Sequence, residues 1–384
     1  MALENYLSRP DLSIKQKLWQ IHWVFVILLC ITAGIGSAML YSAAGGDMEP
    51  WASKHLARFF VGIFVMLVVA IIDIRAWLRY SYLLYVISLI LLASVEFYGT
   101  IGMGAQRWIS LSYISLQPSE LMKIALILAL ARYFHGGSLE DYASLRFLII
   151  PILLVLAPAI LVLRQPDLGT AIMLLIASGS IFFLVGVKFS IFVLAFFTVI
   201  ISIPLGWQFL HAYQKQRVLT FLNPETDPLG SGYHIIQSKI ALGSGGLFGK
   251  GFMQGTQGHL SFLPEMQTDF IFTMLAEEFG MIGGAGLLGL YSLILLYGIA
   301  LSLSSRNQFG RLVGAGVTAT FFIYIFINVA MVMGLVPVVG VPLPLISYGG
   351  TAMLTILFGF GLLLSVWIHR EVIIGQRGSD DLDY

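Results

Sequence analysis

Apolar stretches of membrane-spanning length recur along almost the whole chain. The mean hydropathy is +0.90, and only 11% of the residues are charged, where a soluble domain would carry about 25%. A helix needs about 20 mostly apolar residues to cross a bilayer, so the pattern predicts an all-α, polytopic integral membrane protein with about ten transmembrane helices. The expected spans cover residues 19–42, 57–73, 77–98, 118–134, 146–163, 168–187, 189–207, 269–301, 311–334 and 347–369.

The distribution of basic residues predicts how the chain is oriented. An even number of spans places both termini on one side of the membrane. Cytoplasmic loops carry an excess of Lys and Arg, and the loops on the side of the termini hold most of these residues, so both termini are expected in the cytoplasm. These basic residues are Arg75, Arg79, Arg132, Arg146, Lys188, Arg306 and Arg311.

The longest connection, from about residue 208 to 268, would then lie outside the cytoplasm. A connection of this length is usually functional or disordered, and its aromatic and aliphatic content favours a compact, re-entrant or surface-lying fold. It carries the cations Lys215, Arg217, Lys239 and Lys250. Because Arg and Lys are the usual partners of phosphate, these cations predict a phosphate-bearing ligand. Anionic lipid headgroups explain them equally well.

A second polar group surrounds the expected start of the span at 118–134. Glu120 and Lys123 are three residues apart and share one helix face, and Arg107 precedes them in the preceding loop. Charges inside a membrane tend to pair, so the two residues can simply neutralise each other. Alternatively, Glu120, Lys123 and Arg107 form the wall of a site for an anionic substrate.

Four more carboxylates lie at or near the membrane boundary. Asp167 directly precedes a predicted helix and is expected to be its N-cap. Asp269 stands where the long loop meets the span at 269–301, and there it is either a first-turn or N-cap carboxylate or a working group. Glu277 and Glu278 are adjacent, so at least one should need an internal partner. The same span is long and rich in glycine, Gly280 included, which predicts a tilted, bent or closely packed helix.

Other classes of site have no support in the sequence. No Ser/His/Asp triad can be read, no pair of His has the spacing of metal ligands, and nothing suggests nucleic-acid binding.

A set of short motifs, spread over nearly the whole chain, resembles the SEDS family (shape, elongation, division and sporulation), and within it the RodA-type branch. The motifs are Gly-Ala-Gln-Arg-Trp at 104–108, Gln-Pro-Ser-Glu at 117–120 with Lys123, Gln-Pro-Asp-Leu-Gly-Thr at 165–170, Asp-Pro-Leu-Gly-Ser-Gly-Tyr at 227–233, Gln-Ser-Lys-Ile-Ala at 237–241, Leu-Pro-Glu at 263–265, Thr-Asp-Phe at 268–270, Ala-Glu-Glu-Phe-Gly at 276–280, Pro-Val-Val-Gly-Val-Pro-Leu-Pro at 337–344 and Ser-Tyr-Gly-Gly at 347–350.

The resemblance implies a function and a set of site residues. Residues 1–384 would form one SEDS-type domain of the bacterial cytoplasmic membrane, which polymerises lipid II onto a lipid-linked glycan strand beside a class B penicillin-binding protein, a transpeptidase. Asp269 maps onto the aspartate on which the family depends, and Glu120 and Lys123 onto a polar pair facing its cavity. Two departures are Gln267, where the family commonly has His, and Lys215, where it often has Arg.

The residues and the resemblance together fit one reaction. Asp269 would act as general base on a sugar hydroxyl of lipid II, and undecaprenyl pyrophosphate would leave. Arg107, Lys123, Lys215 and Arg217 are candidates to offset the charge on pyrophosphate, with Lys239 also at the substrate site, and a divalent cation, Mg²⁺ or Mn²⁺, is left open. A flippase for a lipid-linked precursor, or a non-catalytic scaffold, remains as the alternative.

Overall fold

Helices make up almost all of the chain in the computed structural model, which describes residues 13–102, 105–111, 114–138, 140–209, 212–223, 231–256 and 265–375. A helix overlaps each of the ten predicted spans, and the all-α prediction is confirmed. The ten helices are α2 (Trp23–Ala43), α3 (Ala52–Ile71), α4 (Ile74–Tyr98), α5 (Pro118–His135), α6 (Leu145–Arg164), α7 (Leu168–Val185), α8 (Phe189–Phe209), α12 (Ile271–Leu303), α13 (Gln308–Val332) and α14 (Gly350–Ile368).

Eight of these helices are long and apolar enough to cross a membrane. The other two are α5, which carries Glu120, Lys123 and Arg132, and α8, whose apolar part is Phe189–Ser202. The number of spans therefore stays a prediction. Two short helical elements on the described chain are α1 (Ile14–Gln20) and the 3-10 helix η2 (Asp141–Ala143).

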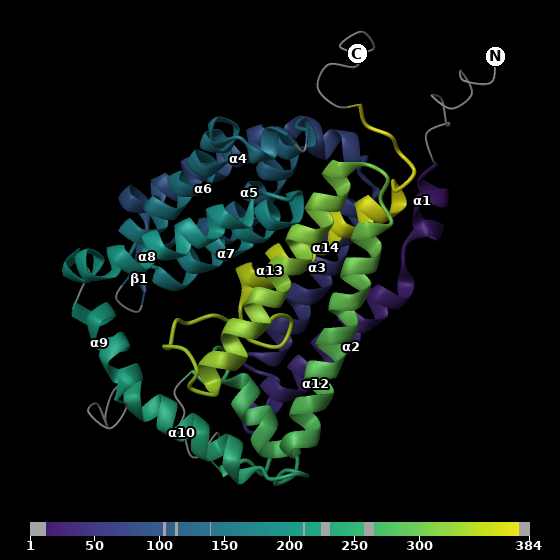
Figure 1. Ribbon diagram of the computed structural model, residues 1–384. Helices are drawn as coiled ribbons and strands as arrows, with labels where there is room; N and C mark the ends of the chain where they lie inside the picture. The colour runs from purple at the N-terminus through teal and green to yellow at the C-terminus, as the bar shows by residue number, and fades with distance from the viewer. Residues whose placement is uncertain are drawn as a thin grey trace.

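The core lies along α13 and α14, which are the most buried of the eight helices. α14 packs along α3, and α13 contacts α5, α7, α12 and α14. Figure 1 shows α13 and α14 between α5 and α7 on one side and α2 and α12 on the other. α5, which carries the predicted site residues Glu120 and Lys123, therefore packs against this core, and both side chains are buried.

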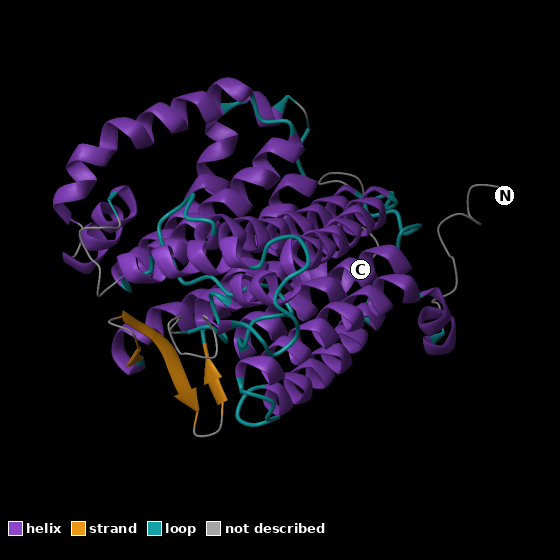
Figure 2. Cartoon of the chain, turned by 90° about the horizontal axis from the view of Figure 1, so that it is seen from below, coloured by secondary structure: helices purple, strands orange, loops and turns teal. Residues whose placement is uncertain are grey.

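A small antiparallel sheet precedes α5 and was not predicted from the sequence. It consists of β1 (Thr100–Gly102), β2 (Ala105–Leu111) and β3 (Ile114–Leu116), in the order β1-β2-β3. Figure 2 shows the strands beside the helices at one edge of the molecule. The middle strand carries Arg107, so the sheet fixes the backbone of one predicted site residue.

The long connection contains two helices, α9 (Ala212–Leu222) and α10 (Ser231–Ser244), in the described part of residues 208–268. α10 packs against α12, and the compact, re-entrant or surface-lying fold of the whole connection stays a prediction. Residues 210–211, 224–230 and 257–264 lie outside the described residues.

α12 bends at Gly280, which is one of the three alternatives (tilted, bent or closely packed) that its glycine-rich sequence left open. Gly280 has φ +67° and ψ −164° inside the helix, and a Cβ there would lie 2.4 Å from the backbone nitrogen of Gly249. Only glycine fits so close to a crossing backbone. Backbone hydrogen bonds from Lys250 to Glu277 (3.0 Å) and from Gly251 to Glu278 (2.9 Å) hold the end of the long connection against this bend.

Candidate functional site

Asp269 lies just before α12 rather than in its first turn. The N-cap of α12 is Phe270, and its first turn contains no acidic residue. The N-cap and first-turn interpretations of Asp269 are therefore wrong. Its half-buried side chain faces the loop between α13 and α14, because a Cβ built on Gly340 would lie 3.4 Å from Asp269 Oδ2. Its backbone carbonyl accepts a hydrogen bond from Asn328 Nδ2 (2.9 Å).

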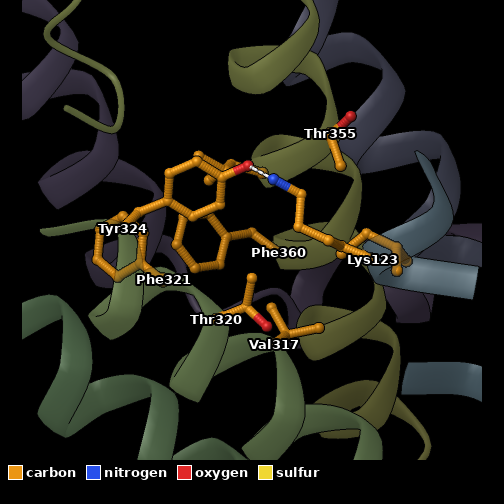
Figure 3. A pocket seen from close by; sticks show the side chains of 9 residues that line it. Lys123, Val317, Thr320, Phe321, Tyr324, Thr355 and Phe360 are labelled. Atoms are coloured by element: carbon orange, nitrogen blue, oxygen red, sulfur yellow. Dashed lines mark hydrogen bonds between the residues drawn. The ribbon is translucent and has the colours of Figure 1, made fainter. Parts of the chain in front are cut away.

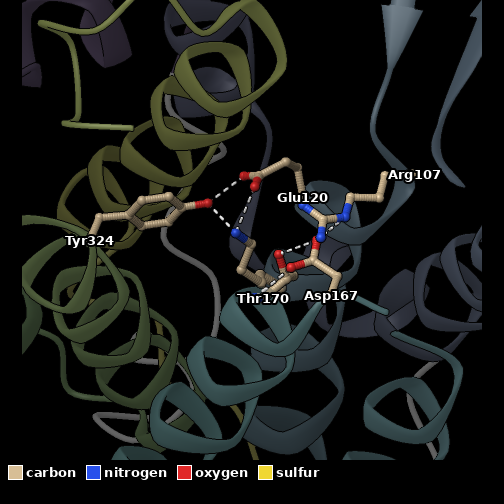
Figure 4. Close-up of polar contacts among 6 residues, drawn as sticks. Arg107, Glu120, Asp167, Thr170 and Tyr324 are labelled. Atoms are coloured by element: carbon tan, nitrogen blue, oxygen red, sulfur yellow. Dashed lines mark hydrogen bonds and ion pairs between the residues drawn. The ribbon is translucent and has the colours of Figure 1, made fainter. Parts of the chain in front are cut away.

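Glu120 and Lys123 form the predicted pair, with Lys123 Nζ 2.7 Å from Glu120 Oε1. The structure adds Tyr324 of α13, whose hydroxyl donates to Glu120 Oε2 and accepts from Lys123 Nζ. Figure 4 shows this arrangement. All three residues are buried, with at most 4% of each exposed. A buried charge costs free energy unless it is paired and hydrogen-bonded, and this trio meets both conditions.

The cavity beside Lys123 is small. It has a volume of about 10 Å³ and is lined by Lys123, Tyr324 and apolar or threonine side chains of α5, α13 and α14, as Figure 3 shows. Such a space is close to the smallest that holds one water molecule. The geometry thus favours a structural role for the pair over direct contact with a sugar or a phosphate, and the predicted place of Glu120 and Lys123 at a substrate wall remains untested.

Arg107 of β2 forms an ion pair with Asp167 at the start of α7. Arg107 Nε lies 3.3 Å from Asp167 Oδ2, and its terminal nitrogen donates to the carbonyl of Pro166 (3.1 Å). Asp167 accepts from the backbone N–H (3.1 Å) and the hydroxyl (2.9 Å) of Thr170, so the predicted N-cap is confirmed. Figure 4 shows this pair next to Glu120.

A large cavity opens beside this ion pair. It has a volume of about 460 Å³ and lies between α7, α9, α13 and residues 336–339. Its lining is apolar, with Ile172, Val218 and Phe326 as examples, and Arg107 and Asp167 bring charge to it. Val339 is in its wall, and the next residue, Gly340, is the one that faces Asp269. The same loop therefore forms part of the cavity wall and faces the Asp269 carboxylate.

The remaining predicted cations are spread over the elements of the long connection. Lys215 is half-buried on α9, one helical turn before Val218 in the cavity wall. The side chain of Arg217 lies outside the described residues. Lys239 of α10 is exposed and lies over Gly334, where a Cβ would be 2.8 Å from its Nζ.

Lys250 has a structural partner. Its Nζ lies 2.6 Å from Glu277 Oε1, and Glu278 accepts a hydrogen bond from the Ser42 hydroxyl (2.5 Å). Both carboxylates are fully buried, so the expectation that at least one of them needs an internal partner is confirmed. No group of three or more His, Cys, Asp or Glu that could hold a metal ion occurs among the described residues.

Comparisons with known proteins agree over nearly the whole chain. The family model for FtsW, RodA and SpoVE, described as "Cell cycle protein", matches residues 18–372. The peptidoglycan glycosyltransferase MrdB of Escherichia coli (strain K12) is 42% identical over 349 residues, which are 91% of this chain and 94% of MrdB. MrdB of Helicobacter pylori (strain ATCC 700392 / 26695) is 38% identical over 334 residues, 83% of this chain and 84% of that protein.

Two solved structures share the fold. A chain of a peptidoglycan synthase complex that performs polymerization and crosslinking matches with a TM-score of 0.79 at 34% identity, covering 91% of this chain and 98% of that one. The rod shape determining protein RodA of Thermus thermophilus matches with a TM-score of 0.69 at 29% identity, covering 91% and 97%.

Proposed function

We propose that this chain, which belongs to the FtsW, RodA and SpoVE family, is a peptidoglycan glycosyltransferase that polymerises lipid II into glycan strands during cell elongation. The relatives named MrdB are called peptidoglycan glycosyltransferases. The resemblance of this chain to the SEDS family is confirmed. One structural observation supports the proposal most strongly. A carboxylate, Asp269, lies against a loop that also forms the wall of a large apolar cavity.

The cavity suits the lipid part of the substrate. Apolar side chains of α7, α9 and α13 line a volume of about 460 Å³, and binding pockets of about 300–1,000 Å³ with a few polar groups are typical of ligand sites. An isoprenoid chain would bury its apolar surface there. Its pyrophosphate would then lie near the polar end of the cavity, beside Arg107.

The charge on the pyrophosphate needs more cations than Arg107. Asp167 lies 3.3 Å from the Arg107 guanidinium, so this pair contributes little net charge. Lys215 and Arg217 lie on α9, which borders the cavity through Val218, and Lys239 lies on α10. These three cations are proposed to offset the charge that develops on the departing group.

Asp269 is proposed as the general base. It accepts the proton of a sugar hydroxyl of lipid II while the hydroxyl oxygen bonds to the anomeric carbon of the lipid-linked strand. The bond from that carbon to the pyrophosphate oxygen breaks, and its electron pair leaves with undecaprenyl pyrophosphate. Direct attack inverts the linkage. Pyrophosphate leaves readily, so a single carboxylate suffices where glycosidases use two.

The proposed orientation follows the positive-inside rule. Both termini lie in the cytoplasm, and Asp269, the cavity and the long connection face the opposite side, where lipid II is polymerised. A class B penicillin-binding protein, which would crosslink the new strands, is the proposed partner. The match to a chain of a complex that performs polymerization and crosslinking supports this partner.

Incubation of the purified chain with lipid II and the partner transpeptidase tests this function. Glycan strands resolved by gel electrophoresis are the expected product. Transfer of lipid II across the bilayer of proteoliposomes, without strand formation, would instead identify a flippase. A chain that does neither while remaining folded and bound to its partner would be a scaffold.

A further inference from the structure

The backbone carbonyls of residues 267–269, around the proposed base, each accept a hydrogen bond from a residue elsewhere in the chain. The carbonyl of Gln267 accepts from the backbone N–H of Tyr348 (2.8 Å). The carbonyl of Thr268 accepts from the Ser347 hydroxyl (2.5 Å), and that of Asp269 from Asn328 Nδ2 (2.9 Å). These residues precede the N-cap of α12, so the helix itself does not fix them. The three hydrogen bonds fix the backbone of these residues instead.

Asn328 connects the base to the loop that it faces. Its amide nitrogen has two hydrogens, and it donates to Asp269 O (2.9 Å) and to Val341 O (2.7 Å). Val341 follows Gly340, the loop glycine that faces the Asp269 carboxylate. Asn328 is fully buried within α13, so this one group sets the spacing between the Asp269 backbone and the facing loop.

Ser347 makes a matching connection from the other end of the same loop. Its hydroxyl accepts from the backbone N–H of Leu343 (2.7 Å) while it donates to the Thr268 carbonyl, and only 3% of the residue is exposed. The hydroxyl therefore shapes the Leu343–Ser347 turn and holds it against the residue before Asp269. Water does not compete for either bond at this level of burial.

We propose that Asn328 and Ser347 are positioning residues, which aim the Asp269 carboxylate at the sugar hydroxyl by clamping its backbone to the α13–α14 loop. The inference rests on the proposed function of Asp269. Neither side chain takes part in the bond changes. Misplacing a reacting group by about 1 Å can lower a rate about 100-fold, so a loosened clamp should slow turnover while lipid II still binds.

The test compares Ser347→Ala, Ser347→Thr and Asn328→Ala in the lipid II polymerisation assay with the partner present. We expect Ser347→Ala and Asn328→Ala to lower kcat by about 10- to 100-fold with KM for lipid II close to wild type. Ser347→Thr keeps the hydroxyl and should recover most of kcat. If Ser347→Ala and Asn328→Ala only destabilised the protein, they would instead lower the amount of folded protein.

Two buried residues of the same types, whose hydrogen bonds do not involve residues 267–269, serve as matched controls. Ser178 donates to Leu174 O (2.7 Å) within α7, and Asn307 caps α13 through Gly310 N (2.6 Å). Ser178→Ala and Asn307→Ala should cost stability but keep kcat per folded molecule.

Four results would overturn the inference. Wild-type kcat in Ser347→Ala and Asn328→Ala would show that no clamp is needed, and a raised KM with normal kcat would make the residues substrate ligands. Failure of Ser347→Thr to recover activity would exclude the hydroxyl as the cause. An active Asp269→Asn would refute the base itself but not the polymerase activity, which only a folded wild-type chain that forms no glycan strands would refute. If Asn328→Ala fails to fold, Ser347→Ala, which removes one hydroxyl, still decides the question.

Discussion

Gly340, in the α13–α14 loop, lies next to the side chain of Asp269: a Cβ on Gly340 would lie 3.4 Å from Asp269 Oδ2. Gly340 also has φ +70°, a conformation that costs roughly 1–2 kcal/mol for other residues. A Cβ at this distance would only make van der Waals contact with the carboxylate, so the positive φ is what favours glycine at position 340.

Gly340→Ala should therefore lower both stability and turnover. The methyl group would stand against the Asp269 carboxylate, in the space through which a substrate hydroxyl is proposed to approach. Gly45→Ala is the matched control, because Gly45 has φ +72° but nothing within 4 Å of its Cβ position. Both variants should lose similar stability in thermal unfolding, and only Gly340→Ala should lose polymerisation. Equal rates in the two variants would show that the loop does not border the reaction.

Filling the large cavity should weaken lipid II binding. Ile172 lines this cavity, and Ile172→Trp adds bulk where the isoprenoid chain is proposed to lie. We expect a higher KM for lipid II with kcat little changed, because the base is untouched. Ile149→Trp, on the exposed face of α6, provides the control. The same KM in both variants would mean that the lipid binds elsewhere.

Tyr324→Phe should destabilise the protein through the ion pair of Glu120 and Lys123. The Tyr324 hydroxyl is hydrogen-bonded to both charged groups. Leaving a buried polar group without its hydrogen-bond partner costs about 1–3 kcal/mol of stability. Tyr85→Phe is the comparison, since the Tyr85 hydroxyl donates to a neutral carbonyl, that of Leu154 (2.9 Å). Thermal unfolding in detergent should show the larger loss for Tyr324→Phe, and an equal loss would argue against a charge-assisted network.

Lys250→Ala should loosen the long connection from α12. Removing one partner of a buried ion pair costs about 3–5 kcal/mol, and 28% exposure of the Lys250 side chain should reduce this value. A double variant with Glu277→Gln should regain part of the stability, because the Glu277 carboxylate is then no longer left as an unpaired buried charge. The exposed pair of Arg306 and Glu371 gives a control, in which Arg306→Ala should cost at most about 1 kcal/mol. A similar loss of stability in Lys250→Ala and Arg306→Ala would contradict the role of Lys250 in holding the long connection to α12.

The sequence predicted local features better than contacts between distant segments. Helices at eight of the ten spans follow from apolar length alone, and the cap at Asp167 follows from the next three residues. The bend at Gly280 was also visible as a glycine-rich stretch. Tyr324 was missed because its partner Glu120 is 204 residues away, although a tyrosine hydroxyl in an apolar helix needs a buried partner.

The clamp around Asp269 and the three strands were missed for related reasons. Asn328 and Ser347 reach carbonyls 59 and 79 residues away, and a sequence pattern gives no register for such contacts. The strands are short, with β1 and β3 of three residues each, which is too few for an alternating pattern to appear.

Polymerisation by Asp269→Asn tests the central claim most directly. The amide keeps the shape of the side chain but cannot accept the proton, so purified Asp269→Asn with the partner transpeptidase should form no glycan strands while it unfolds at the wild-type temperature. Asp47→Asn, which removes an exposed carboxylate, should polymerise normally. Glycan strands formed by folded Asp269→Asn at the wild-type rate would contradict the assignment of Asp269 as the general base.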